Sequence, residues 1–288
     1  IGFIWYNGEI VEWQDATTHV LNHGLHYGSC VFEGLRVYSS DIYKLEKHTD
    51  RLFHSANRMG MEVPYTKNEL NDAQEQIIKK MNISYGYIRP VIWRGSEMMA
   101  ISAQKNKINV AIATWEWPSY FSPEDRLKGL TLQTAEWRRP PANTIPTDAK
   151  AAGLYMICTL SKHKAEKDGF TDALMLDYEG KVAESTGSNI FFVFNGELHT
   201  PIPHCFLDGI TRQTAISIAE KQGIKVVQRD IYPEEIKDAQ EIFLTGSAVE
   251  INPVRKIDDL EFKVGKVTSM ISDLYLSEVD KNYKIDNS

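Results

Sequence analysis

Apolar positions near the start of the chain switch between strand-like and helix-like spacing. Residues 4–11 form two β-type runs around an Asn-Gly pair, the dipeptide most typical of a two-residue hairpin. Residues 47–59 and 67–81 carry apolar side chains three or four positions apart, which predicts two amphipathic helices. Residues 85–94 and 108–117 are rich in β-branched and aromatic residues, which predicts strands. The pattern predicts a small α+β domain in this part of the chain.

A polar stretch with two prolines follows. We interpret residues 118–128 as a linker between a small domain, residues 1–117, and a larger domain, residues 129–288. In the larger domain, short β-type runs alternate with turn signals, and two longer segments have helical spacing. The predicted strands cover residues 130–137, 173–177, 181–184, 190–194, 197–200 and 242–248, and the predicted helices cover residues 155–167 and 210–223.

One lysine stands out because its neighbours are small. Lys150 lies among Ala149, Ala151, Ala152 and Gly153, so a planar ligand could approach its amine, which can attack a carbonyl group. The stretch by itself favours an ordinary surface lysine, since lysines are mostly exposed. Other parts of the chain must decide between the two interpretations.

Two places offer backbone N–H groups to an anion. The start of the helix at residues 209–211 presents unpaired N–H groups, a favourable site for phosphate. The small-residue turn at residues 246–248 can hold an anion in the same way. In residues 23–38, glycines alternate with aromatic residues and histidines, which suits backbone bent around a ligand or a subunit contact, or a glycine-rich strand edge. Arg51, judged by its position alone, is an ordinary solvated arginine.

Composition narrows the class of protein. A hydrophobic content of 42% and a charged content of 25% are typical of a globular protein. The net charge of -7 argues against a nucleic-acid surface, and no apolar run approaches the length of a membrane span. No leader peptide is recognisable, and the chain begins at Ile1 without a methionine. The three cysteines are widely spaced, which favours thiols in a reducing cytoplasm over disulfides or a metal site.

Six motifs, in order, resemble those of the branched-chain aminotransferases, which belong to the class IV aminotransferases and to the fold type IV pyridoxal-phosphate enzymes. They lie at residues 31–36, 87–90, 143–150, 184–189, 209–212 and 246–251. The resemblance implies an α+β protein of two domains, a small N-terminal α/β domain and a larger β-barrel-like α/β domain, with pyridoxal 5'-phosphate at their interface. It also implies a homodimer or a larger homo-oligomer.

The resemblance assigns roles to the cofactor residues. Lys150 holds the cofactor as a Schiff base and moves the substrate's α-proton, and Glu184 faces the pyridine nitrogen, where a carboxylate strengthens the electron sink. The alternative for Glu184 is a surface acid beside a turn. The phosphate is assigned to Arg51, Ile210, Thr211 and Ser247, and a cofactor oxygen to Tyr155.

The substrate residues follow from the same resemblance. The α-carboxylate is assigned to the N–H groups of Ser247 and Ala248 and the hydroxyl of Tyr87, the apolar pocket to Phe32, Tyr120 and Tyr155, and the distal carboxylate of glutamate to Arg89 and Tyr27. Tyr27, Met99 and Ile101 are assigned to a dimer interface. The alternative for the aromatic residues is ordinary core packing.

The implied activity is transfer of the amino group between L-leucine, L-isoleucine or L-valine and 2-oxoglutarate. The alternatives are a D-amino-acid transaminase or an aminodeoxychorismate lyase on the same fold, and a ligand-binding protein without catalysis. Tyr87 and Arg89 favour the first, and the presence of both Lys150 and Glu184 disfavours the last. Two departures, Leu154 where the family has asparagine and Ser247 where it has threonine, bear on substrate preference more than on chemistry.

Overall fold

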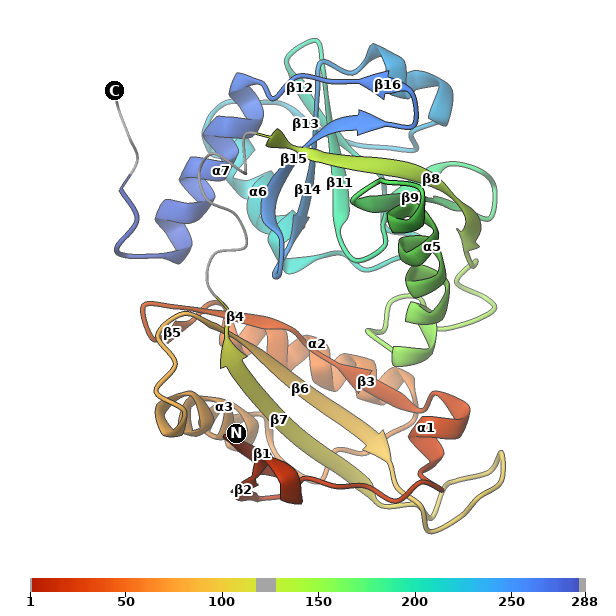
Figure 1. Cartoon of the computed structure of the whole chain (residues 1–288), viewed down its shortest axis with the longest axis vertical. Helices are drawn as coiled ribbons and strands as arrows, with labels where there is room; N and C mark the ends of the chain where they lie inside the picture. The colour runs from red at the N-terminus through yellow and green to blue at the C-terminus, as the bar shows by residue number, and fades with distance from the viewer. Residues whose placement is uncertain (1, 118–127, 285–288) are drawn as a thin grey trace. The chain divides into compact units, whose positions relative to one another are not determined.

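The computed structural model describes residues 2–117 and 128–284 of the chain. These residues divide into two compact units (Figure 1). Unit 1 holds residues 2–117 together with Ala149–Leu154, and unit 2 holds residues 128–148 and 155–284. Residues 118–127 of the predicted linker, including Tyr120, lie outside the described residues.

In the described part of the chain, unit 1 is built on a seven-stranded antiparallel sheet. The strand order is β2-β1-β7-β6-β4-β5, with β3 pairing with β6. The strands are β1 Phe3–Tyr6, β2 Glu9–Glu12, β3 Cys30–Phe32, β4 Leu35–Tyr38, β5 Asp41–Ile42, β6 Gly86–Arg94 and β7 Ile108–Glu116. The long strands β6 and β7 form the centre, which confirms the strands predicted at residues 85–94 and 108–117.

The hairpin predicted in residues 4–11 is present, and a second Asn-Gly pair, between the strands predicted at residues 190–194 and 197–200, forms another. Asn7 and Gly8 have φ angles of 48° and 100° between β1 and β2. Asn195 and Gly196 have φ angles of 51° and 79° between two strands of unit 2. Asparagine and glycine tolerate this left-handed region, and the resulting turn matches the twist of a two-residue hairpin.

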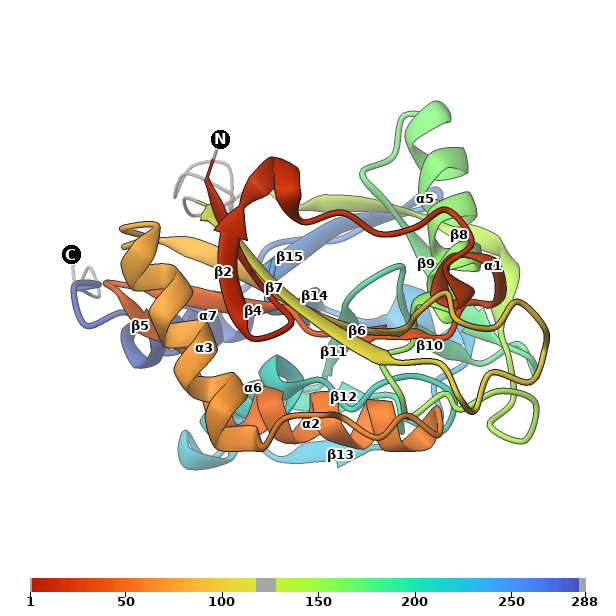
Figure 2. The same ribbon diagram turned by 90° about the horizontal axis from the view of Figure 1, so that it is seen from below.

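Helices α2 Leu45–Arg58 and α3 Lys67–Lys80 confirm the two helices predicted for unit 1, and α1 His23–Tyr27 adds a short turn that the sequence did not indicate. Thr66 and Glu69 form a capping box that starts α3. Helix α2 packs on α3 and β3, and α3 packs on β1 and β7 (Figure 2). The buried side chains of α2 and α3, among them Leu52, Leu70 and Ile77, make the apolar layer against the sheet.

Unit 2 contains a nine-stranded sheet within the described residues. Its strands are β8 Leu130–Arg139, β9 Asp172–Asp177, β10 Val182–Ser185, β11 Asn189–Phe194, β12 Glu197–Thr200, β13 Val226–Gln228, β14 Glu241–Gly246, β15 Glu250–Ile257 and β16 Leu260–Glu261. The order β10-β9-β8-β15-β14-β11 closes on itself because β10 also pairs with β11. This closed ring confirms the barrel-like second domain.

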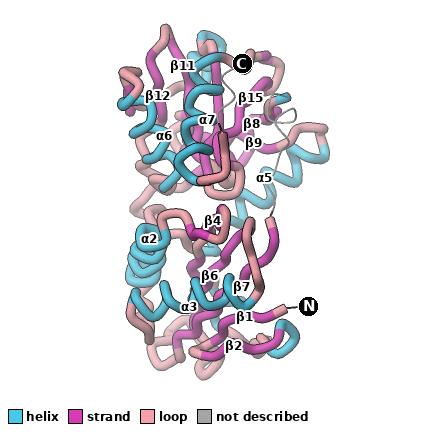
Figure 3. Tube along the Cα trace, turned by 90° about the vertical axis from the view of Figure 1, so that its left-hand side faces the viewer, coloured by secondary structure: helices cyan, strands magenta, loops and turns pink. Residues whose placement is uncertain are grey.

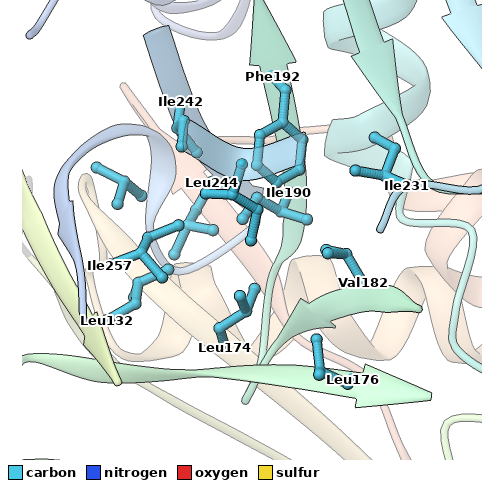
Figure 4. Packing of buried hydrophobic residues seen from close by; sticks show 12 residues of the cluster. Leu132, Leu174, Leu176, Val182, Ile190, Phe192, Ile231, Ile242, Leu244 and Ile257 are labelled. Carbon is cyan, nitrogen blue, oxygen red and sulfur yellow. The ribbon is translucent and has the colours of Figure 1, made fainter. Parts of the chain in front are cut away.

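The ring encloses an apolar core. Twelve buried side chains form one cluster, and Leu174, Ile190, Leu244 and Ile257 point toward one another inside it (Figure 4). They come from different strands of the ring, so each strand contributes its inward face to the same interior. The ring therefore gives unit 2 a rigid frame on which loops at its ends are fixed.

Three helices cover parts of this sheet in the described residues: α5 Met156–Lys167, α6 Ile210–Lys221 and α7 Lys266–Val279. Helix α5 packs on β8 and β9, whereas α6 and α7 lie side by side and both contact β14 (Figure 3). Short 3-10 turns occur at Trp13–Asp15, Ala152–Tyr155 and Pro233–Asp238. The helices predicted at residues 155–167 and 210–223 are confirmed; β13, β15, β16 and α7 were not predicted.

Candidate active site

Lys150 is held by main-chain hydrogen bonds on both sides. Its N–H donates to Oγ of Ser55 on α2 over 2.9 Å, and its carbonyl accepts from the N–H of Phe32, at the end of β3, over 3.1 Å. The next residue, Ala151, forms an isolated antiparallel bridge with Val31. The side chain is half-buried, with Nζ 4.9 Å from the centroid of the Phe32 ring. Lys150 is therefore not a freely solvated surface lysine.

The small neighbours of Lys150 serve close packing. Ala149 and Ala151 are 1% and 2% exposed. A Cβ added to Gly28, which follows α1, would lie 3.5 Å from Cα of Gly153. Small residues thus let this segment lie against β3 and the chain after α1.

Three predicted substrate residues meet in unit 1. Nη2 of Arg89 donates to the hydroxyl of Tyr87 over 3.2 Å, and the guanidinium carbon lies 4.7 Å from the Phe32 ring centroid. Nε of Arg89 is buried and has no hydrogen-bond partner among the residues that the structure describes. A Cβ on Gly34 would lie 1.8 Å from the Tyr87 hydroxyl, so only glycine permits this position of the tyrosine. Phe32, Tyr87 and Arg89 form one cluster, and Phe32 also contacts Lys150.

The residues assigned to a subunit contact are exposed. Tyr27 on α1 is 49% exposed, and Met99 and Ile101 in the loop after β6 are 39% and 86% exposed. Nε2 of His23 lies 3.0 Å from the Ala100 carbonyl oxygen, which ties α1 to this loop. Helix α1 and the loop therefore present apolar side chains to solvent from one linked region.

Glu33 is a buried carboxylate with two partners on α2. Arg51 donates through Nε to Oε1 over 2.6 Å and through Nη2 to Oε2 over 3.0 Å, and Nδ1 of His48 lies 2.7 Å from Oε2. Burial opposes the ionised carboxylate, but the charge of Arg51 and the bond from His48 outweigh it and hold the pKa of Glu33 far below its ordinary value. Burial lowers the pKa of His48 despite its bond to Glu33, so the imidazole is neutral and donates from Nδ1.

Sequence reasoning assigned Arg51 to a phosphate but missed the residues that hold it. The ion pair with Glu33 fixes the guanidinium of Arg51, whose side chain remains 17% exposed. The available signal was helical spacing: His48, Arg51 and Ser55 recur at intervals of three and four and so share one face of α2.

Glu184 on β10 is buried beside a buried arginine. Nε of Arg139 lies 3.3 Å from Oε1 of Glu184 and donates to the carbonyl of Cys205 over 3.3 Å. Nη1 of the same arginine donates to Sγ of Cys158. Burial raises the pKa of Cys158 to about 11 and that of Cys205 to about 12, so both remain neutral thiols. The interpretation of Glu184 as a surface acid is wrong, and Arg139 is a partner that sequence reasoning missed.

The strand register connects Glu184 to the two elements of unit 2 that the sequence predicted to bind an anion. In the strand register, Glu184 on β10 opposes Asn189 on β11, and Asn189 opposes Thr245 near the end of β14. The amide of Asn189 accepts from the N–H of Gly209 over 3.2 Å and donates to the carbonyl of Leu207 over 2.9 Å. Asn189 thereby fixes the start of α6.

The remaining predicted residues of unit 2 lie at element ends. Ile210 and Thr211 open α6, whose N-cap Gly209 makes no side-chain cap. Ser247 and Ala248 follow β14 and are half-buried, and Tyr155 is half-buried at the start of α5. The helix start and the turn after β14 thus present main-chain N–H groups suited to an anion.

Residues 2–117 and 128–284 contain neither a candidate metal-ligand cluster nor a helix that could span a membrane. No group of three or more histidine, cysteine or carboxylate side chains could hold a metal ion there. In the same residues, every helix is too short or too polar to cross a bilayer.

The chain is similar in sequence and fold to proteins of known activity. The family described as Amino-transferase class IV matches residues 30–257. The branched-chain-amino-acid aminotransferase of Pseudomonas aeruginosa is 41% identical, over 96% of this chain and 93% of the relative. A branched-chain amino acid aminotransferase from Thermoproteus uzoniensis, solved with norvaline, has a TM-score of 0.92 at 34% identity, over 96% of this chain and 94% of that one.

Two further structures of a branched-chain amino acid aminotransferase hold the cofactor or an adduct of it. The structure solved with pyridoxamine 5'-phosphate has a TM-score of 0.94 at 37% identity, over 96% of this chain and 94% of that one. The structure with N-(5'-phosphopyridoxyl)-L-glutamate has a TM-score of 0.93, with the same identity and coverage. Both ligands are derivatives of pyridoxal phosphate.

Proposed function

Because the chain belongs to the class IV aminotransferases, we propose that it is a branched-chain-amino-acid transaminase that uses pyridoxal 5'-phosphate. It moves the amino group between L-leucine, L-isoleucine or L-valine and 2-oxoglutarate. The observation that carries the proposal is the half-buried Lys150, whose main chain is fixed on both sides, in a chain that also buries Glu184 against Arg139.

The described residues fit this cofactor. Its aldehyde needs an amine, its ring nitrogen a carboxylate, and its phosphate main-chain N–H groups or a cation. Lys150, Glu184 and the start of α6 supply these groups. A Cβ on Gly209 would lie 2.2 Å from Oδ1 of Asn189, so glycine alone lets the α6 start keep this position.

Each residue then has a chemical task. Bound pyridoxal phosphate supplies an electron sink for negative charge at the substrate's α-carbon. Lys150 would attach the cofactor through Nζ and would take and return the α-proton at the same atom. The charge of Glu184 holds a proton on the ring nitrogen. Arg51, Ile210, Thr211 and Ser247 would hold the phosphate, and Tyr155 would contact a cofactor oxygen.

Substrate recognition must serve an apolar side chain and the carboxylate of glutamate. The α-carboxylate binds the N–H groups of Ser247 and Ala248 and the Tyr87 hydroxyl. The Phe32 ring contacts the apolar side chain. Arg89, supported by Tyr27, binds the distal carboxylate, and its buried Nε supplies a donor that has no other partner among the described residues.

We also propose a homodimer or larger homo-oligomer in the cytoplasm. The exposed apolar side chains of Tyr27, Met99 and Ile101 support a subunit contact, because burial in a partner removes them from water. Among the described residues the cysteines form no disulfide, which supports a reducing compartment. The proposed domains remain residues 1–117 and 129–288, joined by residues 118–128.

A half-reaction assay tests the activity. The absorbance of the bound cofactor is followed after separate addition of L-leucine, D-alanine and aminodeoxychorismate to the purified protein. The proposal expects a rapid spectral change with L-leucine and none of comparable rate with the other two. A faster change with D-alanine would favour a D-amino-acid transaminase, and pyruvate release from aminodeoxychorismate would favour the lyase.

A further inference from the structure

Both main-chain polar groups of Lys150 have partners in unit 1. The N–H donates to the hydroxyl of Ser55, and the carbonyl accepts from Phe32. Ser55 is 0% exposed, so its hydroxyl is the acceptor for this N–H in a place that excludes water. A buried N–H that loses its acceptor is costly, so Ser55 strongly restricts where the main chain of Lys150 can lie.

The same helix ties Lys150 to a second site element. Ser55 lies four residues after Arg51 on α2, one helical turn along the same face. Arg51 is bound by Glu33, which directly follows Phe32. The contacts therefore close a ring from Lys150 through Ser55, Arg51, Glu33 and Phe32 back to Lys150, and every member lies in unit 1.

We propose that Ser55 is a positioning residue for Lys150: its hydroxyl fixes the main chain from which the reactive amine extends and couples that amine to α2. This inference rests on the proposed function, in which Lys150 attaches the cofactor. A long, flexible side chain delivers its amine accurately only when its base is fixed, and small misplacements of a reacting group reduce rates strongly.

The test compares two serine-to-alanine variants. Ser55→Ala removes the hydroxyl that accepts from Lys150. Ser161→Ala is the matched control, because Ser161 is also a buried helical serine, 4% exposed, and its Oγ has no hydrogen-bond partner among the described residues. Ser55→Thr keeps the hydroxyl and serves as the rescue variant.

The first readout is independent of turnover. Hydrogen exchange of the Lys150 amide is measured by overlapping peptides in the cofactor-free protein. We expect exchange to accelerate roughly tenfold in Ser55→Ala and to stay unchanged in Ser161→Ala, as for the loss of one hydrogen bond. Equal protection of the Lys150 amide in both variants would overturn the inference.

The second readout uses the loaded enzyme. The pH midpoint of the cofactor absorbance should shift in Ser55→Ala, and kcat should fall about tenfold or more with little change in KM, since a displaced amine affects proton transfer more than substrate binding. Ser55→Thr should restore both. A loss that appears only as a lower melting temperature, with the pH midpoint unchanged, would make Ser55 merely structural.

Two outcomes separate this inference from the function on which it rests. If borohydride labels another lysine in the wild-type protein, the proposed function fails, and the positioning of a cofactor lysine fails with it. If the label is on Lys150 but Ser55→Ala changes neither the exchange rate of the Lys150 amide nor the pH midpoint of the cofactor absorbance, the positioning role alone fails. If Ser55→Ala does not fold, Ser55→Cys replaces it, because cysteine keeps the side-chain volume but is a weaker hydrogen-bond acceptor. Slow exchange of the Lys150 amide in the wild type that becomes rapid in Ser55→Cys would support the inference. Rapid exchange in the wild type would contradict it.

Discussion

Nε of Arg139 lies 3.3 Å from Oε1 of Glu184, and the two side chains are only 5% and 11% exposed. Burial works against the charge of the guanidinium, but the attractions of Glu184, Cys158, Tyr155 and Cys205 together outweigh it and raise the pKa of Arg139. A cation bound this way favours the ionised form of its partner. The ionised carboxylate is the form of Glu184 that its proposed role beside a protonated ring nitrogen requires.

The charge of Glu184 can be removed with little change of shape. Glu184→Gln should still bind the cofactor, but its turnover should fall by about two orders of magnitude or more, corresponding to an electrostatic contribution of roughly 3 kcal/mol. Glu136→Gln, at an exposed position on β8, is the control. Turnover and cofactor affinity are measured on each variant. Normal turnover combined with weaker cofactor binding would show that Glu184 is structural.

Lys150→Ala should abolish transamination, because no other group would supply the amine and the proton transfer. Borohydride reduction of the wild type followed by peptide mapping should place the pyridoxyl group on Lys150. The exposed Lys221→Ala variant should react normally. A label on a different lysine, or substantial activity in Lys150→Ala, would refute the assignment.

Arg89→Leu should separate the two substrates. The half-reaction with glutamate should weaken by roughly 1.5 to 3 kcal/mol, the contribution of a charge-assisted hydrogen bond, whereas the half-reaction with isoleucine should change much less. If Arg89 instead braces β6, both half-reactions and the melting temperature should fall together. The structure favours the first outcome, since within the described residues Arg89 forms no ion pair and its guanidinium donates to the hydroxyl of Tyr87.

His48 predicts a pH dependence of stability. The pKa of His48 is lowered in the folded chain. Below the ordinary histidine pKa of about 6.5, His48 therefore binds a proton in the unfolded chain but stays neutral in the folded chain. The stability that His48 contributes is therefore present above that pH and lost below it, at up to about 1.4 kcal/mol per pH unit.

Denaturant unfolding at about pH 7.5 and about pH 5.5, on either side of the ordinary histidine pKa, measures this effect. His48→Gln should lose less stability between the two values than the wild type, because glutamine does not titrate. The exposed His163→Gln variant should behave as the wild type does. Parallel losses in the wild type and His48→Gln would exclude His48 as the titrating group.

Elements with local signals could be predicted from the sequence, and those fixed by distant contacts could not. The hairpins at Asn7 and Asn195, and helix α3 with its cap at Thr66, carry their own turn and capping residues. Strand β15 is different: it begins at Glu250 with φ 58° and contains a proline, and its first five residues are buried without alternation. Pairing with β14 on one side and β8 on the other, rather than its own pattern of apolar and polar residues, makes this segment a strand.

The site shows the same division. The motifs could name Lys150 and Glu184, whose chemistry the resemblance supplies. They could not name Ser55, which bonds to Lys150 across 95 positions of sequence, or Arg139, which in the sequence is only the second of two arginines before a proline. Tertiary packing brings such partners together, so the local periodicity of the sequence does not predict them.

Unit 1 is discontinuous in the chain, because Ala149–Leu154 returns to it after part of unit 2 has been laid down. During synthesis the sheet strands β1 to β7 leave the ribosome first. The edge beside β3 and the hydroxyl of Ser55 gain their partners, Ala151 and the N–H of Lys150, only after residues up to 154 have been synthesised. A nascent chain, or a fragment cut in the linker, would therefore carry an unfinished first unit without its lysine. The segment that bears Lys150 is also the one that completes the fold of unit 1.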